Sequence, residues 1–387
     1  MVFECLHRGS LLEKDRLNMK DKSNDKFTII TVCRNEEKSM RRTIESVLKQ
    51  TWKSFEYIII DGASTDGTAN IVYEYANRDK RIKWYSEKDD GIYNAMNKGI
   101  NRAKGEFVYF LNAGDWYYDD NILEKVAEFL DTTKAHLLIG DIVLRYNSKA
   151  MRISYEVGEK LRENLKKRIG ICHQAIFADR VTLLNGFDEM FTVCADYNWL
   201  CQQVNGDKKI AKINAIIANY DTSGFSSQVQ NRKLLIRESM EIMKKNFPET
   251  NLSNCDEIEN LLIEKEKNRS LYELMNRWLV LNQRKISICS YFIDKKIKKI
   301  AIYGIHYIGE RLYDELKDTQ VNVSYAIDQS KDKREWKIPV IQPDENFEYV
   351  DAIVITPVFD FVEIKTRLLK KIKCLLISIE EILFYDY

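Results

Sequence analysis

The chain has 387 residues, of which 45% are hydrophobic and 31% are charged, a balance typical of soluble globular proteins. Its 60 basic and 59 acidic residues give a net charge of +1, which argues against a nucleic-acid-binding protein. The length predicts two domains, no apolar run is long enough for a membrane span, and we expect no signal peptide.

Eight cysteines are scattered through the chain without a Cys-x-x-Cys pair, and the four histidines do not cluster with them. This pattern predicts reduced, mostly buried thiols in a cytoplasmic protein and no zinc site.

Residues 1–25 are polar and charged without a sustained period, and we expect a disordered leader there. From residue 27 onward, apolar runs alternate with polar loops and helical patterns. The predicted strands are 27–32, 57–60, 82–86 and 107–111, and a helix follows each of the first three. This order is typical of a doubly wound α/β sheet.

The loops after parallel strands meet at one edge of a sheet, so we expect Glu36, Asp61 and Asp66 to converge there. Carboxylates at such an edge can accept hydrogen bonds from a nucleobase or a ribose hydroxyl. The strand-end position of Asp61 favours ligand contact, whereas Asp66 is better explained as a helix cap. Asn97 and Lys98 are placed outward on their helix, where they are able to reach a diphosphate.

The strand at 107–111 ends in Asn112-Ala-Gly-Asp115. The two polar side chains can supply hard oxygen ligands to a divalent cation. On these four residues alone, an Asx-type turn that closes the strand explains the pattern equally well.

Beyond a predicted strand at 135–144, residues 145–170 are polar, and we interpret them as a mobile loop. The charges of residues 166–168, taken alone, favour a solvated surface run. A lone histidine such as His173 is more often structural than a ligand. Spacing alone assigns Asp196, at the start of the helix YNWLCQQV, as an N-cap.

Six motifs, in this order and spacing, resemble the family 2 glycosyltransferases: FTIITVCRNEE, IIIDGASTDGT, SEKDDGIYNAMNKGI, GEFVYFLNAGD, HQAIF and ADYNWL. Within that family the chain is most similar to the bacterial subgroup that builds O-antigen, colanic-acid and capsular polysaccharides. The resemblance covers residues 26–228. It implies a GT-A fold, a nucleotide-diphosphate sugar donor, a divalent metal (Mn²⁺ or Mg²⁺), no organic cofactor and inversion at the anomeric carbon.

The resemblance also implies roles for individual residues. It assigns donor binding to Thr31, Val32, Arg34, Glu36, Asp61, Asp90, Asn97 and Asn112, with Asp61 at the nucleobase, and places His173 near the diphosphate or the acceptor. Asp115 falls on the last acid of the family's metal motif and Asp196 on the catalytic acid. Because Asn112 and Gly114 stand where many relatives carry acids, the metal would depend on one carboxylate and the donor's phosphates.

Residues 229–298 have helical periodicity and a basic surplus, which fits either a helical connector, the preferred interpretation, or peripheral contact with anionic lipid at the inner membrane surface. Residues 299–387 restart an α/β pattern that resembles half of a Rossmann domain, with Gly304, Gly309 and Asp328 in the expected places. His306 replaces the glycine that admits a pyrophosphate, so a docking or scaffold role is favoured over dinucleotide binding.

Two functions remain open from the sequence. The first is an inverting transferase that moves a sugar, most simply from a UDP donor, to a lipid-linked or polysaccharide acceptor. The second is a catalytically silent nucleotide-sugar-binding or assembly protein, which the thinned metal motif and the extra C-terminal domain make plausible. The presence of both Asp115 and Asp196 favours the enzyme. The sequence leaves oligomerisation open.

Overall fold

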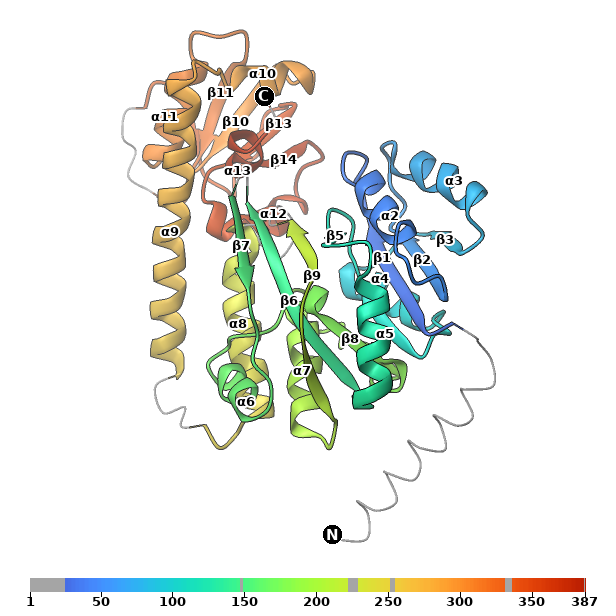
Figure 1. The fold of residues 1–387 in the computed structure, drawn as a ribbon. Coiled ribbons are helices and arrows are strands. Elements are labelled where there is room, and N and C mark those ends of the chain that lie inside the picture. The colour runs from blue at the N-terminus through green and yellow to red at the C-terminus, as the bar shows by residue number, and fades with distance from the viewer. Residues whose placement is uncertain (1–24, 147–148, 222–228, 251–254, 331–335, 386) are drawn as a thin grey trace. The chain divides into compact units, whose positions relative to one another are not determined.

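The computed structural model describes residues 25–146, 149–221, 229–250, 255–330, 336–385 and 387. The chain divides into two compact units (Figure 1). The first comprises Met1–Gly224 with Arg237–Ser253, and the second comprises Phe225–Ile236 with Asn254–Tyr387. The predicted leader lies outside the described residues, apart from Asp25.

Within the described residues, the first unit contains a mixed sheet in the order β3-β2-β1-β4-β8-β6-β9-β5, with β7 beside β6. The first four of these strands run parallel, and β8 is antiparallel to β4. The strands are β1 (Phe27–Cys33), β2 (Phe55–Asp61), β3 (Ile82–Ser86), β4 (Phe107–Phe110), β5 (Trp116–Tyr117), β6 (Leu137–Tyr146), β7 (Lys149–Ile153), β8 (Ile176–Asp179) and β9 (Ile210–Asp221).

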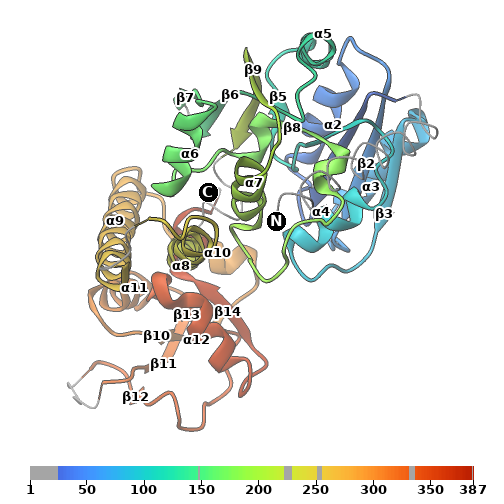
Figure 2. The same cartoon turned by 90° about the horizontal axis from the view of Figure 1, so that it is seen from below.

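Helices cover both faces of the parallel part of this sheet (Figure 2). Phe27 and Ile29 of β1 share a buried cluster with residues of α2, α3 and α5, while Ile30 faces Gly99 of α4 on the other side. Alternate residues of a strand point to opposite faces, so a strand buried on both reads as a continuous apolar run. The helices are α2 (Met40–Leu48), α3 (Thr68–Arg78), α4 (Ile92–Ile100), α5 (Ile122–Thr133), α6 (Glu159–Lys166), α7 (Ala195–Asn205) and α8 (Val229–Asn246), and the 3₁₀ turns are η1 (His173–Ala175) and η2 (Arg180–Leu183).

The prediction of one mobile loop at 145–170 was wrong, because this stretch contains β7 and α6. Strand β7 is mostly exposed and pairs with β6 along one edge, so its sequence carries no apolar alternation. Its Arg152 side chain donates hydrogen bonds at 2.5 and 2.9 Å to the buried carboxylate of Asp141, which also accepts from Lys212 at 2.8 Å. These contacts tie β7 and β9 to β6 without apolar burial.

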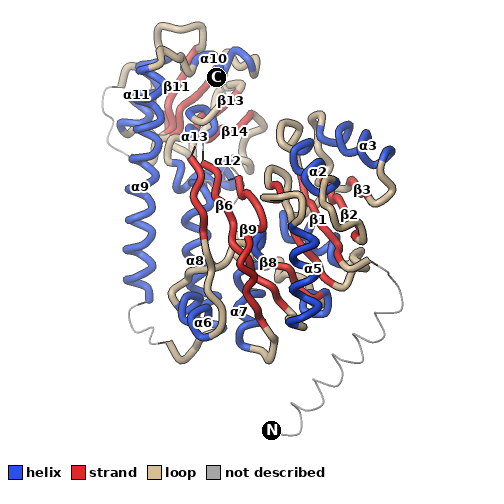
Figure 3. The backbone as a smooth tube through the Cα atoms, in the orientation of Figure 1, coloured by secondary structure: helices blue, strands red, loops and turns tan. Residues whose placement is uncertain are grey.

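The second unit has a parallel sheet in the order β12-β11-β10-β13-β14, with helices on both faces (Figure 3). Residues of α9, α11 and α13 share one buried cluster with β10, and residues of α12 share another with its alternate positions. The elements are α9 (Cys255–Gln283), α10 (Cys289–Asp294), β10 (Lys299–Tyr303), α11 (Tyr307–Leu316), β11 (Asn322–Ile327), β12 (Val340–Ile341), β13 (Ala352–Ile355), η4 (Val358–Asp360), α12 (Phe361–Leu368), β14 (Leu375–Ser378) and α13 (Ile379–Leu383).

The predicted α/β class, with a mixed sheet and a second α/β unit, is therefore confirmed. Among the described residues, no helix combines the length and the apolar character that crossing a membrane requires.

Candidate active site

The parallel strands β1, β2 and β4 end at one edge of the first sheet. Cys33, the last residue of β1, lies in register with Asp61, the last residue of β2. The polar loops singled out from the sequence follow directly after these ends. The edge therefore brings together segments that are far apart along the chain, as expected for parallel strands.

Asp61 is fully buried, and its carboxylate is held by the loop after β2 and by the last residues of β1 and β3. It accepts hydrogen bonds from Ser64 Oγ at 2.5 Å, from the Ser64 backbone N–H at 3.2 Å, from Ser86 Oγ at 2.6 Å and from Cys33 Sγ at 3.9 Å. A carboxylate can accept about four hydrogen bonds, so these donors fix its orientation at the sheet edge.

The four residues predicted on the first loop do not all present side chains to this edge. Thr31 and Val32 are buried within β1, and Thr31 Oγ1 donates to Leu111 O at 2.6 Å. Arg34 is exposed and Glu36 half-buried. Burial raises the pKa of Glu36, and the nearby Asp221 carboxylate acts in the same direction, while Ser39 Oγ opposes them by donating at 2.5 Å.

Asp90 is exposed, whereas Asn97 is engaged with a distant loop. Asn97 Nδ2 donates to Phe187 O at 2.9 Å and to Glu189 Oε1 at 2.7 Å, and its Oδ1 accepts from the Phe187 N–H at 2.7 Å. The amide thus fastens residues 187–189 to α4.

The turn from Asn112 to Asp115 is held by two consecutive residues of η1. Gln174 Nε2 donates to Asp115 Oδ2 at 2.8 Å, and His173 Nε2 lies 3.1 Å from Asn112 Nδ2. The Oδ1 atom of Asn112 is buried and has no hydrogen-bond partner within the described part of the chain. A buried acceptor without a partner costs free energy unless a ligand satisfies it, which makes this oxygen a candidate ligand atom.

Asp115 is only 3% exposed. Burial raises the pKa of its carboxyl group to about 7, against the lowering effect of hydrogen bonds from the Asp221 backbone N–H and from Gln174. The Asp221 carboxylate adds to the rise, as it does for Glu36. The Asp221 side chain therefore interacts electrostatically with Glu36, in the loop after β1, and with Asp115, at the end of the 112–115 turn.

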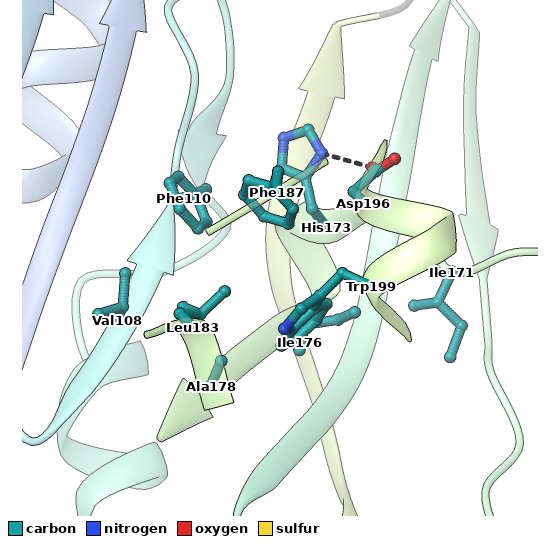
Figure 4. A pocket seen from close by; sticks show the side chains of 10 residues that line it. All are labelled: Val108, Phe110, Ile171, His173, Ile176, Ala178, Leu183, Phe187, Asp196 and Trp199. Carbon is teal, nitrogen blue, oxygen red and sulfur yellow. Dashed lines mark hydrogen bonds and ion pairs between the residues drawn. The ribbon is translucent and has the colours of Figure 1, made fainter. Parts of the chain in front are cut away.

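Asp196 lies in the first turn of α7, and Figure 4 shows its contact with His173. Its Oδ2 lies 3.1 Å from His173 Nδ1, and its Oδ1 accepts from Tyr93 Oη and from the Tyr197 N–H. A neutral His173 that carries its proton on Nδ1 satisfies both its contacts, because it then donates to Asp196 and accepts from Asn112. His173 thus connects the predicted catalytic acid to the predicted metal turn.

An apolar pocket extends beneath this pair. Figure 4 shows His173 and Asp196 at one end and aliphatic side chains such as Val108 and Leu183 at the other. The low polarity of this lining reduces the local dielectric and strengthens the His173–Asp196 interaction.

Two residues of the site were missed from the sequence: Tyr93 and Gln174. Gln174 had a signal, since it follows His173 in the HQAIF motif. Tyr93 lies on the buried side of α4, where no local pattern marked it. Within the described residues, no group of three His, Cys, Asp or Glu side chains is arranged to hold a metal alone.

Comparison with known proteins gives a family match for part of the region that carries this site, up to the end of β8. Residues 28–179 match the family model described as Glycosyl transferase family 2. A curated PGL/p-HBAD biosynthesis glycosyltransferase from Mycobacterium bovis (strain BCG / Pasteur 1173P2) is 27% identical over 220 residues, which cover 55% of this chain and 84% of that protein. The glycosyltransferase GlyA of Streptococcus pneumoniae is 26% identical over 151 residues, 38% of this chain and 21% of that protein.

Two solved structures resemble part of the chain. S. aureus TarS 1–349 in complex with UDP-GlcNAc has a TM-score of 0.46 and 18% identity, covering 57% of this chain and 67% of that one. The mannosyltransferase PcManGT from Pyrobaculum calidifontis, in complex with GDP-Man and Mn²⁺, has a TM-score of 0.45 and 17% identity, covering 63% and 73%. The family match and the curated relatives support a glycosyltransferase.

Proposed function

We propose that the chain is an inverting glycosyltransferase that moves a sugar from a nucleotide-diphosphate donor to an acceptor hydroxyl. The observation that carries this proposal is the continuous contact path from Asp196 through His173 and Asn112 to the turn that ends at Asp115. This path connects Asp196, which is suited to deprotonating the nucleophile, with Asp115, which is suited to stabilising the leaving group. A displacement reaction needs both functions.

For the donor we propose the sheet edge beyond β1 and β2. In this proposal Asp61 contacts the nucleobase. The remaining parts of the donor are lined by Arg34, Glu36, Asp90 and Asn97. Thr31 and Val32 contribute through the β1 backbone that shapes this edge, because their side chains are buried. A UDP-sugar is the preferred donor class, a choice consistent with the UDP-GlcNAc bound by TarS, although PcManGT holds GDP-Man.

The oxygen atoms near Asp115 fit a divalent metal that arrives with the donor. The Asp115 carboxylate and the unpaired Asn112 Oδ1 are hard ligands of the kind that Mg²⁺ and Mn²⁺ prefer, but they are too few to complete the coordination. Asp115 and Asn112 would hold the ion together with diphosphate oxygens. When bound, it would neutralise charge that develops on the departing diphosphate.

On the acceptor side, Asp196 is proposed as the general base. As the acceptor oxygen bonds to the anomeric carbon and the bond from that carbon to the diphosphate breaks, the hydroxyl proton passes to Asp196. A base of this kind typically contributes about 10²–10⁴-fold in rate. Tyr93 and His173 hold its two oxygens, so the carboxylate is oriented before the acceptor arrives.

The acceptor and pathway are proposed by analogy with the named relatives. A lipid-linked or polysaccharide acceptor in surface polysaccharide biosynthesis, reached in the cytoplasm at the inner membrane surface, matches the resemblance to the O-antigen and capsule subgroup. The PGL/p-HBAD relative is likewise named for a biosynthetic transfer.

For residues 299–387 we propose a Rossmann-like scaffold without a dinucleotide. The Asp328 carboxylate, which would contact a ribose, accepts from the Ile305 and Ser330 backbone N–H groups at 2.9 and 2.7 Å. A Cβ added at Gly304 would lie 2.8 Å from Thr356 Oγ1. The Asp328 carboxylate is therefore already hydrogen-bonded to the protein backbone, and protein atoms fill the space beside Gly304 that a pyrophosphate would need.

The function is tested by incubating the full chain with a panel of UDP- and GDP-sugars, with and without Mn²⁺, and measuring released UDP or GDP. We expect release from at least one donor, dependent on metal and lost in Asp196→Asn. Nucleotide binding without release from any donor, with or without simple glycan acceptors, would support the silent sugar-nucleotide-binding protein instead.

A further inference from the structure

A buried carboxylate outside the matched region lies directly behind the turn that leads into α7. Glu238 of α8 is 5% exposed. Its Oε1 accepts from the Thr192 N–H at 2.7 Å, and its Oε2 accepts from the Val193 and Cys194 N–H groups, both at 2.9 Å.

One of these bonds satisfies the backbone N–H of the N-cap residue of α7, and the other two fix the turn that precedes the helix. Cys194 occupies the N-cap position of α7 and makes no side-chain capping hydrogen bond. The first backbone N–H groups of a helix have no intrahelical partner, and a carboxylate near them is also stabilised by the helix dipole. Three charge-assisted hydrogen bonds offset the desolvation of Glu238 and fix residues 192–194.

The fixed turn is connected to Asp196 by one further residue. Val193 gives its N–H to Glu238, and its carbonyl oxygen lies 2.8 Å from Tyr93 Oη, whose single proton is shared between this oxygen and Asp196. The same Tyr93 oxygen lies 2.8 Å from Asp196 Oδ1. The position of the Asp196 carboxylate therefore depends on a turn held from one side by Tyr93 and from the other by Glu238.

Other contacts show that the C-terminal half of α8 belongs to this wall of the site. Asn246 Nδ2 donates to Asn198 Oδ1 of α7 at 3.1 Å, and Lys245 Nζ lies 3.6 Å from Asp188 Oδ2. Glu238 is thus one of several points at which α8 is fastened to the acceptor-side segments, and it is the one next to the catalytic turn.

We propose that Glu238 is a positioning residue for Asp196, acting through the backbone of residues 192–194. The proposal rests on the proposed function, since it needs Asp196 as the base. The bonds of the Glu238 carboxylate go to residues 192–194 and not to the donor or metal residues, so its removal should change the chemical step and leave donor binding intact.

The test compares Glu238→Gln with Glu241→Gln, which changes an exposed glutamate on the same helix. Glutamine keeps the size of the side chain but turns an NH₂ group toward at least one backbone N–H. Donor hydrolysis is measured across pH, and the rate is expressed per binding site counted by titration with UDP and Mn²⁺. We expect kcat per site to fall about 10²-fold in Glu238→Gln, with KM for the donor unchanged and the acidic limb of the pH profile moved. Glu241→Gln should match the parent.

A structural role alone would lower the number of binding sites or the melting temperature and leave kcat per site and the pH profile unchanged, and that result overturns the proposal. Should Glu238→Gln fail to fold, Glu238→Asp retains the charge but retracts it by one methylene, and the same comparison applies.

Tyr93→Phe provides a second approach through a double-mutant cycle. Because both residues act on Val193, the double variant with Glu238→Gln should lose less activity than the product of the two single losses, and full additivity contradicts the proposal.

Asp196→Asn is measured in parallel. If it retains full hydrolysis, the base assignment fails, whereas an inactive Asp196→Asn beside an unaffected Glu238→Gln rejects only the positioning role.

Discussion

The unusual acid of this site is Asp115, and replacing it with asparagine should change how stability depends on pH. Burial raises the pKa of Asp115 from an ordinary 3.8 to about 7 in the folded protein. Between these values the folded chain keeps a proton that the unfolded chain has released, so stability falls as pH rises. At 1.36 kcal/mol per pKa unit, the full loss on going from below pH 4 to above pH 7 is about 4 kcal/mol.

The Asp115→Asn variant would carry no charge at this position at any pH, so this loss would disappear. The amide would also turn its NH₂ group toward either the Gln174 amide or the Asp221 N–H, which costs about 1–3 kcal/mol at all pH values. Metal-free Asp115→Asn should therefore be less stable than the parent at pH 4, where the parent has lost almost none of this free energy, and more stable at pH 8, where the parent has lost all of it. Urea unfolding in EDTA at pH 4, 5, 6, 7 and 8 measures both curves. Parallel curves would refute the assignment of the raised pKa to Asp115.

The remaining predictions concern catalysis, metal and the sheet. Asp196→Asn should lower donor hydrolysis by about 10²–10⁴-fold while its UDP affinity, measured by calorimetry, stays within about twofold of the parent. Mn²⁺ titrated alone should bind weakly, and UDP should strengthen its binding at least tenfold, because protein oxygens alone do not complete the coordination; equal affinity with and without UDP contradicts this. Although burial acts to raise the pKa of Asp141, hydrogen bonds from Lys212, Arg152 and Ser154 lower it. Asp141→Asn should thus cost about 1–3 kcal/mol of unfolding free energy at pH 7, and the cost should fall only below pH 3.8, as the pH approaches the lowered pKa at which the folded parent loses its charge. Denaturation at pH 7 and at several pH values below 3.8 measures this difference.

The parallel strands were predictable from the sequence because burial on both faces leaves an unbroken apolar run. Strands β1 and β2 are buried at every position, and their polar successors emerge where parallel strands must end. Strand β7 was not predictable, since its register depends on β6 and its polar contacts on Asp141, neither of which leaves a periodic pattern in residues 149–153.

Residues of the candidate site could be named from the sequence only where a short motif contains the acid that the chemistry needs. Asp115 and Asp196 were both named from the sequence, but their partners come from elsewhere: Tyr93 is 103 positions from Asp196, and Gln174 is 59 positions from Asp115. Asn97 was predicted to line the donor, and the hydrogen bonds of its amide to Phe187 and Glu189 became visible only in three dimensions. Side-chain convergence of this kind depends on packing between elements, which a single sequence does not encode locally.

The raised pKa and the sparse metal motif have one common explanation. A lone buried carboxylate without a cation is disfavoured in its charged form, so near neutral pH the metal-free protein retains a proton on Asp115. The Asp221 carboxylate increases this tendency, and its ion-pair partner Arg42, at 3.2 Å, also donates to Gly114 O. A cation without a diphosphate would lack ligands at this turn. Under the proposed function, a metal–nucleotide complex would supply the missing ligands, and Asp115 would release its proton as it binds the ion. A motif with one carboxylate would then favour the complex over the free cation.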